Sequence, residues 1–342
     1  MSEKNKTIYK SILTGSGLII IFAGLKIADK IVVPFFLAMF IALISLPLLK
    51  YFQSKKINTP LSVTLVLVTI MSVSLSIAAL IGTSLNSFRK SLPEYKEKIY
   101  HEIDKLSNFA EKYDITINSD IMNNYIDPTF IMQFVANTIS AFGNVLTNYL
   151  LILLIVMFTL LEAAGFSNKL KLAFKNSEKS INNFNNFSNN MNKYLTIKTI
   201  VSILTGTIIY IFLTIINLDH AIMWALIAFF LNYIPSIGSI IASIPAIIIA
   251  LIQYNIYYAL LVAGIYMAVN VIMGSIIEPK YLGKELGLST LIIFLSLLFW
   301  GWLLGPVGML LSVPLTMILK IGLESNNDTK WIAILLGRNI SN

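Results

Sequence analysis

The sequence predicts an all-α polytopic membrane protein, with six full spans and two re-entrant hairpins that are broken by proline and glycine and form an inverted repeat. Of its 342 residues, 56% are hydrophobic and only 12% are charged, a composition typical of many membrane helices. No Asp, Glu, Lys or Arg occurs over 221–277 or over 286–319, and proline and glycine interrupt each run near its middle. Charge-free runs of this length are expected in a bilayer, where a charge is costly.

Six apolar segments have the length of about 20 residues that crosses the hydrocarbon core. They are 11–28, 31–49, 61–85, 142–161, 199–216 and 256–277. Lys4, Lys6 and Lys10, before the first segment, resemble the start of a signal peptide. A second apolar run follows at once, however, and no cleavage site of small residues is evident, so we expect the first segment to be retained as a helix.

Two further regions, 221–252 and 288–319, are each too long for one span and too short for two spans with a loop. Their central turns are almost entirely apolar, whereas a turn that reaches water is expected to carry polar residues. The first arm, 221–234, would measure only about 21 Å as a helix. We therefore expect re-entrant hairpins whose breaks are buried in protein or line a wet cavity. The residues predicted to break them are Pro235, Gly238, Pro245, Gly301, Gly305, Pro306, Gly308 and Pro314.

Lysine residues gather near the amino terminus, at 50–56 and over 169–198, while 86–141 carries more acidic than basic residues. This bias predicts that both termini are cytoplasmic and that 86–141 lies outside. The spans 199–216 and 256–277 would then run in opposite directions, each followed by one broken hairpin. Inverted repeats of this kind are typical of transporters, whose solute sites lie at paired helix breaks.

The chain is accordingly divided into five parts. They are 1–85, with spans 1 to 3; 86–141, a helical insert outside the membrane; 142–198, with span 4 and a basic amphipathic cytoplasmic loop; 199–320, the transport core with both hairpins; and 321–342, an amphipathic cytoplasmic tail. In the loop, Ile181, Phe184 and Phe187 lie at helical spacing among Asn and Lys. This pattern favours a helix at the membrane surface over a docking site for a regulator.

The sequence predicts neither an enzyme nor a protein with a metal or cofactor. It has no phosphate-binding loop, nucleophile elbow or cysteine, and His101 and His220 lie far apart in polar loops. The net charge of +8 is interpreted as the cytoplasmic lysine bias and not as a nucleic-acid surface. The expected partners are therefore the lipid bilayer and a small polar solute.

Polar side chains inside the predicted core are the candidates for solute binding. A buried amide needs hydrogen-bond partners on both ends, which favours Asn232 and Asn270. Serine hydroxyls commonly serve helix packing in membranes, so packing is the alternative role for each serine. Trp300 and Trp302, beside the second break, are expected to anchor at the membrane interface. The residues predicted to bind solute are Asn232, Tyr233, Ser236, Gly238, Ser239, Asn270 and Ser312.

The acidic residues nearest the membrane lie at the ends of predicted spans, at Asp29, Glu162, Asp219 and Glu278. A cation-coupled antiporter usually places a carboxylate near the middle of the membrane, where ion binding and protonation compete. Glu278 is the candidate for such coupling, with Lys280 or Lys284 as its expected partner in an ion pair. The pattern nevertheless argues against a deeply buried ion site.

Three motifs resemble the autoinducer-2 exporter family: NYIPSIG at 232–238, EPKYLG at 278–283 and FWGWLLGPVG at 299–308. The resemblance covers the whole chain in length and hydropathy and is specific mainly over 232–320. It implies a permease of the bacterial inner membrane that exports small molecules, with autoinducer-2 as the named substrate. It also implies a homo-oligomer, a pentamer, that moves its transport core by an elevator-like mechanism.

The family also contains members assigned to sodium/proton antiport, so the resemblance does not fix the cargo. Autoinducer-2 is a small, hydroxyl-rich molecule, and hydroxyls and amides around broken helices could replace its water shell. Export of autoinducer-2 is therefore the leading hypothesis. The alternatives are a sodium (lithium)/proton antiporter that uses Glu278 and a non-transporting membrane scaffold that acts through 86–141.

Overall fold

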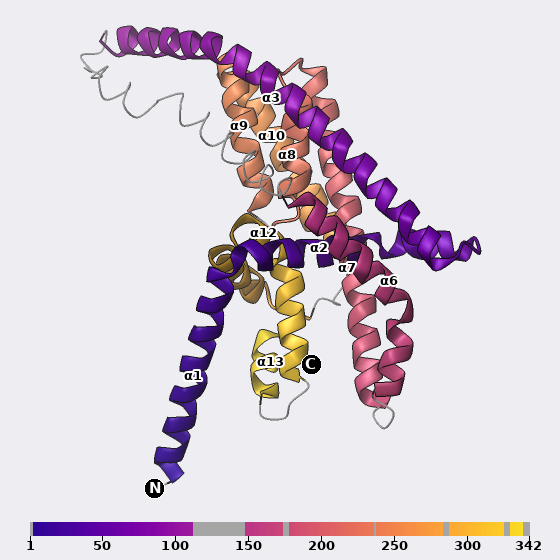
Figure 1. Cartoon of the computed structure of the whole chain (residues 1–342). Helices are drawn as coiled ribbons and strands as arrows, with labels where there is room; N and C mark the ends of the chain where they lie inside the picture. Colours follow the sequence, from indigo (N-terminus) through magenta and orange to yellow (C-terminus); the bar gives the residue numbers. More distant parts are fainter. Residues whose placement is uncertain are drawn as a thin grey trace. The chain divides into compact units, whose positions relative to one another are not determined.

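The computed structural model describes residues 3–111, 148–173, 178–235, 237–282, 287–324 and 329–337. Within these ranges every secondary-structure element is a helix (Figure 1), which confirms the predicted all-α class. In chain order the helices are α1 (Glu3–Ile27), α2 (Asp29–Ser54), α3 (Thr59–Glu111), α6 (Tyr149–Ala173), α7 (Glu178–Ile215), α8 (Ala221–Leu231), α9 (Gly238–Gln253), α10 (Ile256–Asn270), the π-helix η1 (Val271–Ile277), α11 (Glu278–Leu282), α12 (Thr290–Glu324) and α13 (Lys330–Leu336).

Five helices in the described part of the chain are long and apolar enough to cross a membrane. They are Asp29–Ser54, Thr59–Ser91, Ser188–Ile215, Ile256–Tyr281 and Thr290–Glu324. Shorter apolar helices occur in the predicted first and fourth spans, at Gly15–Ile27 and Tyr149–Ala163. α8 and α9 have 11 and 16 residues, and each is shorter than the about 20 residues that a span needs.

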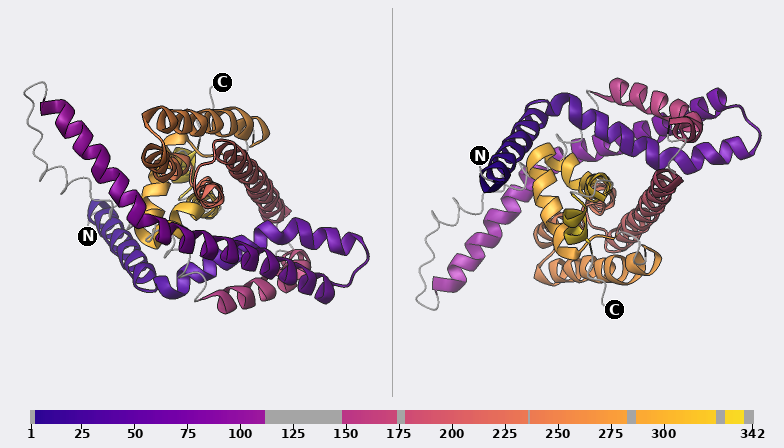
Figure 2. Two further views of the ribbon diagram at one scale, coloured as in Figure 1. Left: turned by 90° about the horizontal axis from the view of Figure 1, so that it is seen from above. Right: turned by 90° about the horizontal axis from the view of Figure 1, so that it is seen from below.

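Two helices are longer than the sequence predicts. α3 continues from its apolar part past Pro93 to Glu111, and it appears as one long ribbon in both views of Figure 2. A proline inside a helix removes one backbone hydrogen bond and can bend the helix without ending it. α7 joins the predicted surface helix of the cytoplasmic loop to the span 199–216 without a break. The rest of the predicted insert, 112–141, lies outside the described residues.

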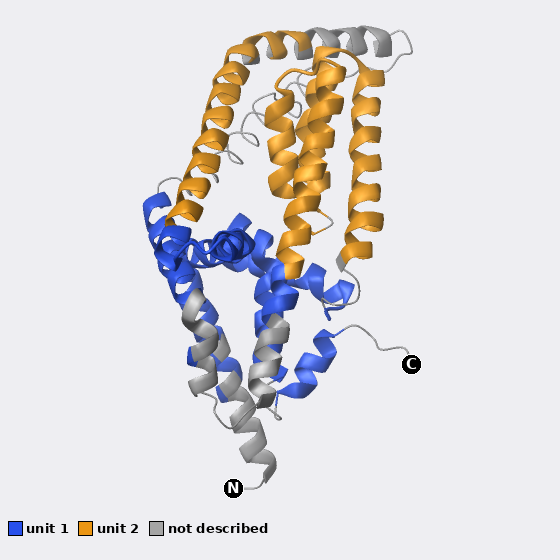
Figure 3. Cartoon of the chain, turned by 90° about the vertical axis from the view of Figure 1, so that its right-hand side faces the viewer, with its two compact units in different colours: residues 1–63, 148–192, 286–342 blue, residues 64–147, 193–285 orange. Residues whose placement is uncertain are grey.

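The chain forms two compact units, which are coloured separately in Figure 3. Unit 1 comprises residues 1–63, 148–192 and 286–342, and it contains α1, α2, α6, α12 and α13. Unit 2 comprises residues 64–147 and 193–285, and it contains most of α3 and α7 together with α8 to α11. The first predicted hairpin therefore belongs to unit 2 and the second to unit 1.

The core of unit 2 is made by apolar side chains of α7, α8, α9 and α10. Its fully buried members include Ile209 and Leu213 on α7 and Trp224 on α8. α9 packs against both α8 and α10, and Ala242 and Ala246, one turn apart, are buried in these contacts. Small residues on one face let neighbouring helices approach closely, as is common in membrane proteins.

In unit 1, α2 packs against α6. Ile152, Val156 and Leu160 recur every four residues on α6 and are all buried, which gives α6 one apolar face for this contact. α13, from the predicted tail, packs against α12. The backbone N–H of Ser289 donates to the carbonyl oxygen of Leu336 at 3.2 Å. The helical part of the tail is therefore a folded part of unit 1.

Candidate functional site

Both predicted hairpins contain a helix break. In unit 2, α8 ends at Leu231 and α9 begins at Gly238. In unit 1, α12 is interrupted at Gly305, whose φ of 66° and ψ of −150° are not helical. Pro245 and Pro314, predicted as break residues, lie inside α9 and α12 instead. Prolines are tolerated inside membrane helices when neighbouring groups satisfy the freed backbone.

A glycine after each break lets the two arms of a hairpin meet. A Cβ atom on Gly238 would lie 1.8 Å from the carbonyl oxygen of Leu231, and a Cβ atom on Gly308 would lie 2.0 Å from the carbonyl oxygen of Trp300. Neither position accepts a larger residue without movement of the backbone, because close-packed interiors have no spare volume. The two hairpins therefore use glycine in the same way, to bring the second arm onto the backbone of the first.

The first break carries two polar side chains that contact one face of α7. Asn232 Nδ2 donates a hydrogen bond to Ser202 Oγ at 2.9 Å, and both residues are buried. The hydroxyl of Tyr233 donates to Thr199 Oγ1 at 2.8 Å. Thr199 in turn donates to the carbonyl oxygen of Leu195 at 2.7 Å. The amide and the phenol at the break are thus held by hydroxyls of α7.

One turn before Ser202, Lys198 forms a buried ion pair with Glu278. Lys198 Nζ lies 2.9 and 2.8 Å from the two carboxylate oxygens of Glu278, and the two side chains are 4% and 17% exposed. The sequence predicts Lys280 or Lys284 as the partner of Glu278, and it assigns Lys198 to a cytoplasmic loop. The structure gives Glu278 a different partner from the expected Lys280, because α7 continues through Lys198 and this side chain is buried in unit 2. Lys284 lies outside the described residues, and the cytoplasmic location of the loop stays a prediction.

The polar face of α7 continues for another turn beyond Ser202. Thr205 is buried, and its hydroxyl has no hydrogen-bond partner among the described residues. Gly206 lies against α8, since a Cβ atom there would be 3.0 Å from Cβ of Phe229. Sequence reasoning missed these α7 residues, although Lys198, Ser202 and Thr205 recur at helical spacing within an apolar span and could have identified the face.

The other predicted solute-binding residues of unit 2 are more dispersed. Ser239 is half-buried in the first turn of α9, and Asn270 is half-buried at the end of α10. The side-chain oxygen of Asn270 faces Gly274, where a Cβ atom would lie 3.3 Å away. Ser236 lies outside the described residues. The contacts on α7 therefore single out Asn232 and Tyr233 among the predicted set.

The second hairpin has its own internal contacts within unit 1. Trp300 Nε1 donates to Thr316 Oγ1 at 3.0 Å, and both residues are buried. Ser312 is fully buried on the same helix. The prediction that Trp300 anchors at the membrane interface is therefore wrong. Trp302 is exposed within the chain, and Lys26 of α1 donates to its carbonyl oxygen at 2.9 Å and lies 4.0 Å from its ring centre.

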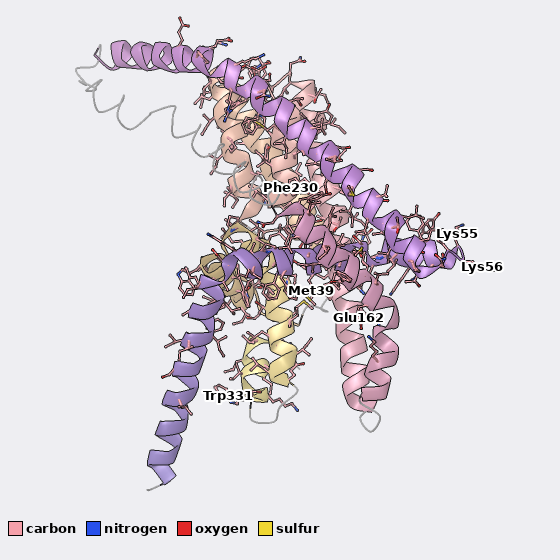
Figure 4. The ribbon with its side chains drawn as sticks, viewed as in Figure 1. Met39, Lys55, Lys56, Glu162, Phe230 and Trp331 are labelled. Atoms are coloured by element: carbon pink, nitrogen blue, oxygen red, sulfur yellow. The ribbon has the colours of Figure 1, made fainter. Side chains whose placement is uncertain are left out.

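Within the described residues, the arrangement offers hydrogen-bonding groups beside a buried ion pair. In the part of the chain that the structure describes, no three His, Cys, Asp or Glu side chains gather as metal ligands. Glu162, labelled on α6 in Figure 4, is exposed and pairs with Lys169 of the same helix. The acidic side chain beside the polar face of α7 is Glu278, and Lys198 neutralises it.

Comparison with known proteins gives a consistent set of matches. The family model described as "AI-2E family transporter" matches residues 16–327. The chain is 40% identical over 341 residues to the "Putative transport protein" of Haemophilus influenzae, covering 98% of each protein. It is 39% identical over 319 residues to the AI-2 transport protein TqsA of Escherichia coli strain K12, covering 93% of each. It is also 32% identical over 335 residues to YhhT of the same strain, covering 98% of this chain and 96% of that one.

Proposed function

We propose that this chain, which belongs to the AI-2E transporter family and is a multi-pass membrane transport protein, exports a solute. The proposed solute is small, uncharged and polar. Autoinducer-2 is the candidate cargo, because the similar E. coli protein is named for its transport. The solute would bind at the first helix break, against the polar face of α7. Asn232, Tyr233, Ser202 and Thr205 would supply hydrogen bonds.

The observation that carries this proposal is the hydrogen bond between Asn232 and Ser202 beside the buried pair of Lys198 and Glu278. A hydroxyl-rich solute loses its water on entering a membrane protein and needs amides and hydroxyls in exchange. The two charges cancel, so the cluster has no net charge to attract an ion. This combination suits a neutral solute with several hydroxyl groups better than a cation.

We further propose that both hairpins are re-entrant and enter from opposite sides of the membrane, with both termini in the cytoplasm. α8 is about 16 Å long, roughly half the thickness of the hydrocarbon core. Alternating access would be elevator-like, with unit 2 carrying the cargo within a homo-oligomer, a pentamer by family resemblance. The chain contains no cysteine, so single cysteines at Ser236 and Val307 can be labelled from each side. Reaction of both cysteines from the same side only would contradict opposite entry.

Deletion and overexpression in cells test the cargo. Deletion should raise the intracellular level of autoinducer-2 relative to the medium, and overexpression should lower it. The same protein with Asn232→Ala should fail to restore export. Ser243→Ala is the matched control, because the Ser243 hydroxyl donates only locally to Ile240 in the structure. Unchanged accumulation in both the deletion and the overexpressing cells would exclude this cargo.

The runner-up function is a sodium (lithium)/proton antiporter, which the burial of the Glu278 carboxylate favours. Its ion pair with Lys198 argues against it, because a cation would have to displace the ammonium group. Replacing Glu278→Gln should abolish pH-dependent sodium or lithium flux in everted vesicles if the chain is an antiporter. Autoinducer-2 export with no such flux in the wild-type protein would decide for the leading proposal.

A further inference from the structure

The outer part of α3, residues 85–111, leads into the predicted insert and contains two buried aromatic residues. Of the most apolar window in Thr59–Ser91, only 6% is buried within the chain. Phe88 and Tyr95, two turns apart, are buried nonetheless. Both belong to the core cluster of unit 2. The base of the predicted insert is therefore packed onto the rest of unit 2 at one place.

That place is the turn between α7 and α8, where Asp219 is bound from three helices. The hydroxyl of Tyr95 on α3 donates to Asp219 Oδ2 at 2.7 Å. Trp224 Nε1 on α8 donates to the carbonyl oxygen of Asp219 at 2.9 Å. The backbone N–H of Asp219 donates to Gln253 Oε1 at the end of α9, at 2.8 Å. Both arms of the first hairpin and α3 thus meet at one residue.

Aromatic packing closes the same junction. The ring of Phe88 lies edge-on to Trp224, with centroids 5.8 Å apart, and edge-on to His220 at 5.4 Å. Trp224 is completely buried. Burial and the hydrogen bond to Asp219 raise the pKa of Tyr95 far above its usual value, so the phenol stays a neutral donor. If this contact opened as a gate during transport, water would have to enter between the side chains. Phe88, Tyr95 and Trp224 are instead buried together, as in a protein core.

We infer that Phe88 and Tyr95 are positioning residues that fix the outer end of α8, and that the outer part of α3 moves as one body with the candidate site. α8 is a single helix of 11 residues. Phe88 contacts Trp224 in the first turns of α8, and Tyr95 contacts Asp219 just before α8 begins. Asn232 and Tyr233 directly follow the last residue of α8. A shift of α3 is therefore transmitted along a short, rigid element to the first break.

Distance measurements between spin labels test this inference without any cargo. Labels on Glu97→Cys in α3 and Tyr257→Cys in α10 use exposed positions of a chain that lacks cysteine. In nanodiscs, with labelled chains diluted in unlabelled wild-type chains so that each oligomer carries one labelled pair, the pair should give one narrow distance, unchanged by autoinducer-2. Tyr95→Ala should broaden it, and Tyr95→Phe, which keeps the ring, should restore it largely. Leu80→Ala, an exposed residue of the same helix, is the control.

A second distance population in the otherwise unchanged chain would overturn the inference. The transport readout rests on the proposed function: Tyr95→Ala should raise the KM for autoinducer-2 by about fivefold with a smaller change in the maximal rate. A uniform loss of active protein would instead lower the maximal rate alone, and this outcome would reduce Tyr95 to a structural role. If the wild-type chain carries no autoinducer-2, the proposed cargo fails while the distance measurement still decides the inference.

Discussion

Lys198 and Glu278 are oppositely charged residues whose side chains are both largely buried in the folded chain. Each ion loses hydration that costs several kcal/mol, and the pair recovers this through two hydrogen bonds between the ammonium group and the carboxylate. The contact joins α7 to the first residue of α11. Loss of one partner leaves the other charge buried and unpaired, which is more damaging than loss of both.

Single and double substitutions should therefore be strongly non-additive. Lys198→Met or Glu278→Gln alone should lower the free energy of unfolding by about 3–5 kcal/mol, and the double variant should recover much of that loss. The control is the exposed pair of Lys169 and Glu162, whose side chains are 65% and 53% exposed and should contribute about 1 kcal/mol or less. Unfolding in nanodiscs measures all of these; additive losses for Lys198 and Glu278 would contradict the account.

His220 should make stability depend on pH. Burial lowers the pKa of His220 below its usual value, while Asp219 opposes the shift. When the folded-state pKa is depressed, the unfolded chain takes up the proton first, so stability is complete above the unfolded pKa and is lost as pH falls below it. The melting temperature should fall between about pH 7.5 and about pH 5.5.

His220→Asn is the matched variant for this test. His220 has a positive φ of 59°, and asparagine tolerates that conformation better than most residues. Its melting curve should change less with pH than that of the wild-type chain. His101→Asn, the other histidine of the sequence, is the control. Equal pH dependence in the wild type and in His220→Asn would show that other groups titrate.

At the scale of elements, the two hairpins depend on glycines that bring their arms together. Gly238→Ala would place a methyl group 1.8 Å from a carbonyl oxygen, so it should destabilise unit 2 by about 1–3 kcal/mol or more and abolish export. Gly264→Ala is the control, because a Cβ atom there meets nothing within 4 Å. It should be neutral or slightly stabilising in a helix. Thermal unfolding and export assays of both variants check this, and a fully active Gly238→Ala protein would contradict it.

Interruptions such as those at 232–238 and at Gly305 can be predicted from the sequence because their causes are local, whereas Pro245 and Pro314 lie inside helices. The sequence itself shows glycine at 238, 305 and 308 and the apolar runs around them. The partners of the break cannot be predicted in this way, because they depend on how α7 packs. Lys198 and Glu278 are 80 residues apart, and their pairing requires the rotation of α7 relative to α10 and α11. The role of Ser202 could not be predicted for the same reason, because it is one of several serines in apolar spans and its contact with Asn232 depends on how α7 packs.

At the scale of the whole molecule, the compact units divide the chain so that each contains one broken hairpin. Unit 2 also holds the polar face of α7, the buried ion pair and the junction with α3. A transport cycle that moves unit 2 as a body would carry the candidate site and residues 64–111 of α3 together. The long helices α3 and α7, which belong partly to each unit, are two of the connections that such a motion would have to bend.

Autoinducer-2 flux through purified protein in liposomes shows whether the first helix break binds the cargo. Wild-type protein should carry it, and Asn232→Ala and Ser202→Ala should each slow it by about tenfold or more, because a buried polar group left unpaired costs about 1–3 kcal/mol. Ser243→Ala should match the wild type. Flux that is equal in all four proteins, or absent from all of them, would contradict a cargo site at the first helix break.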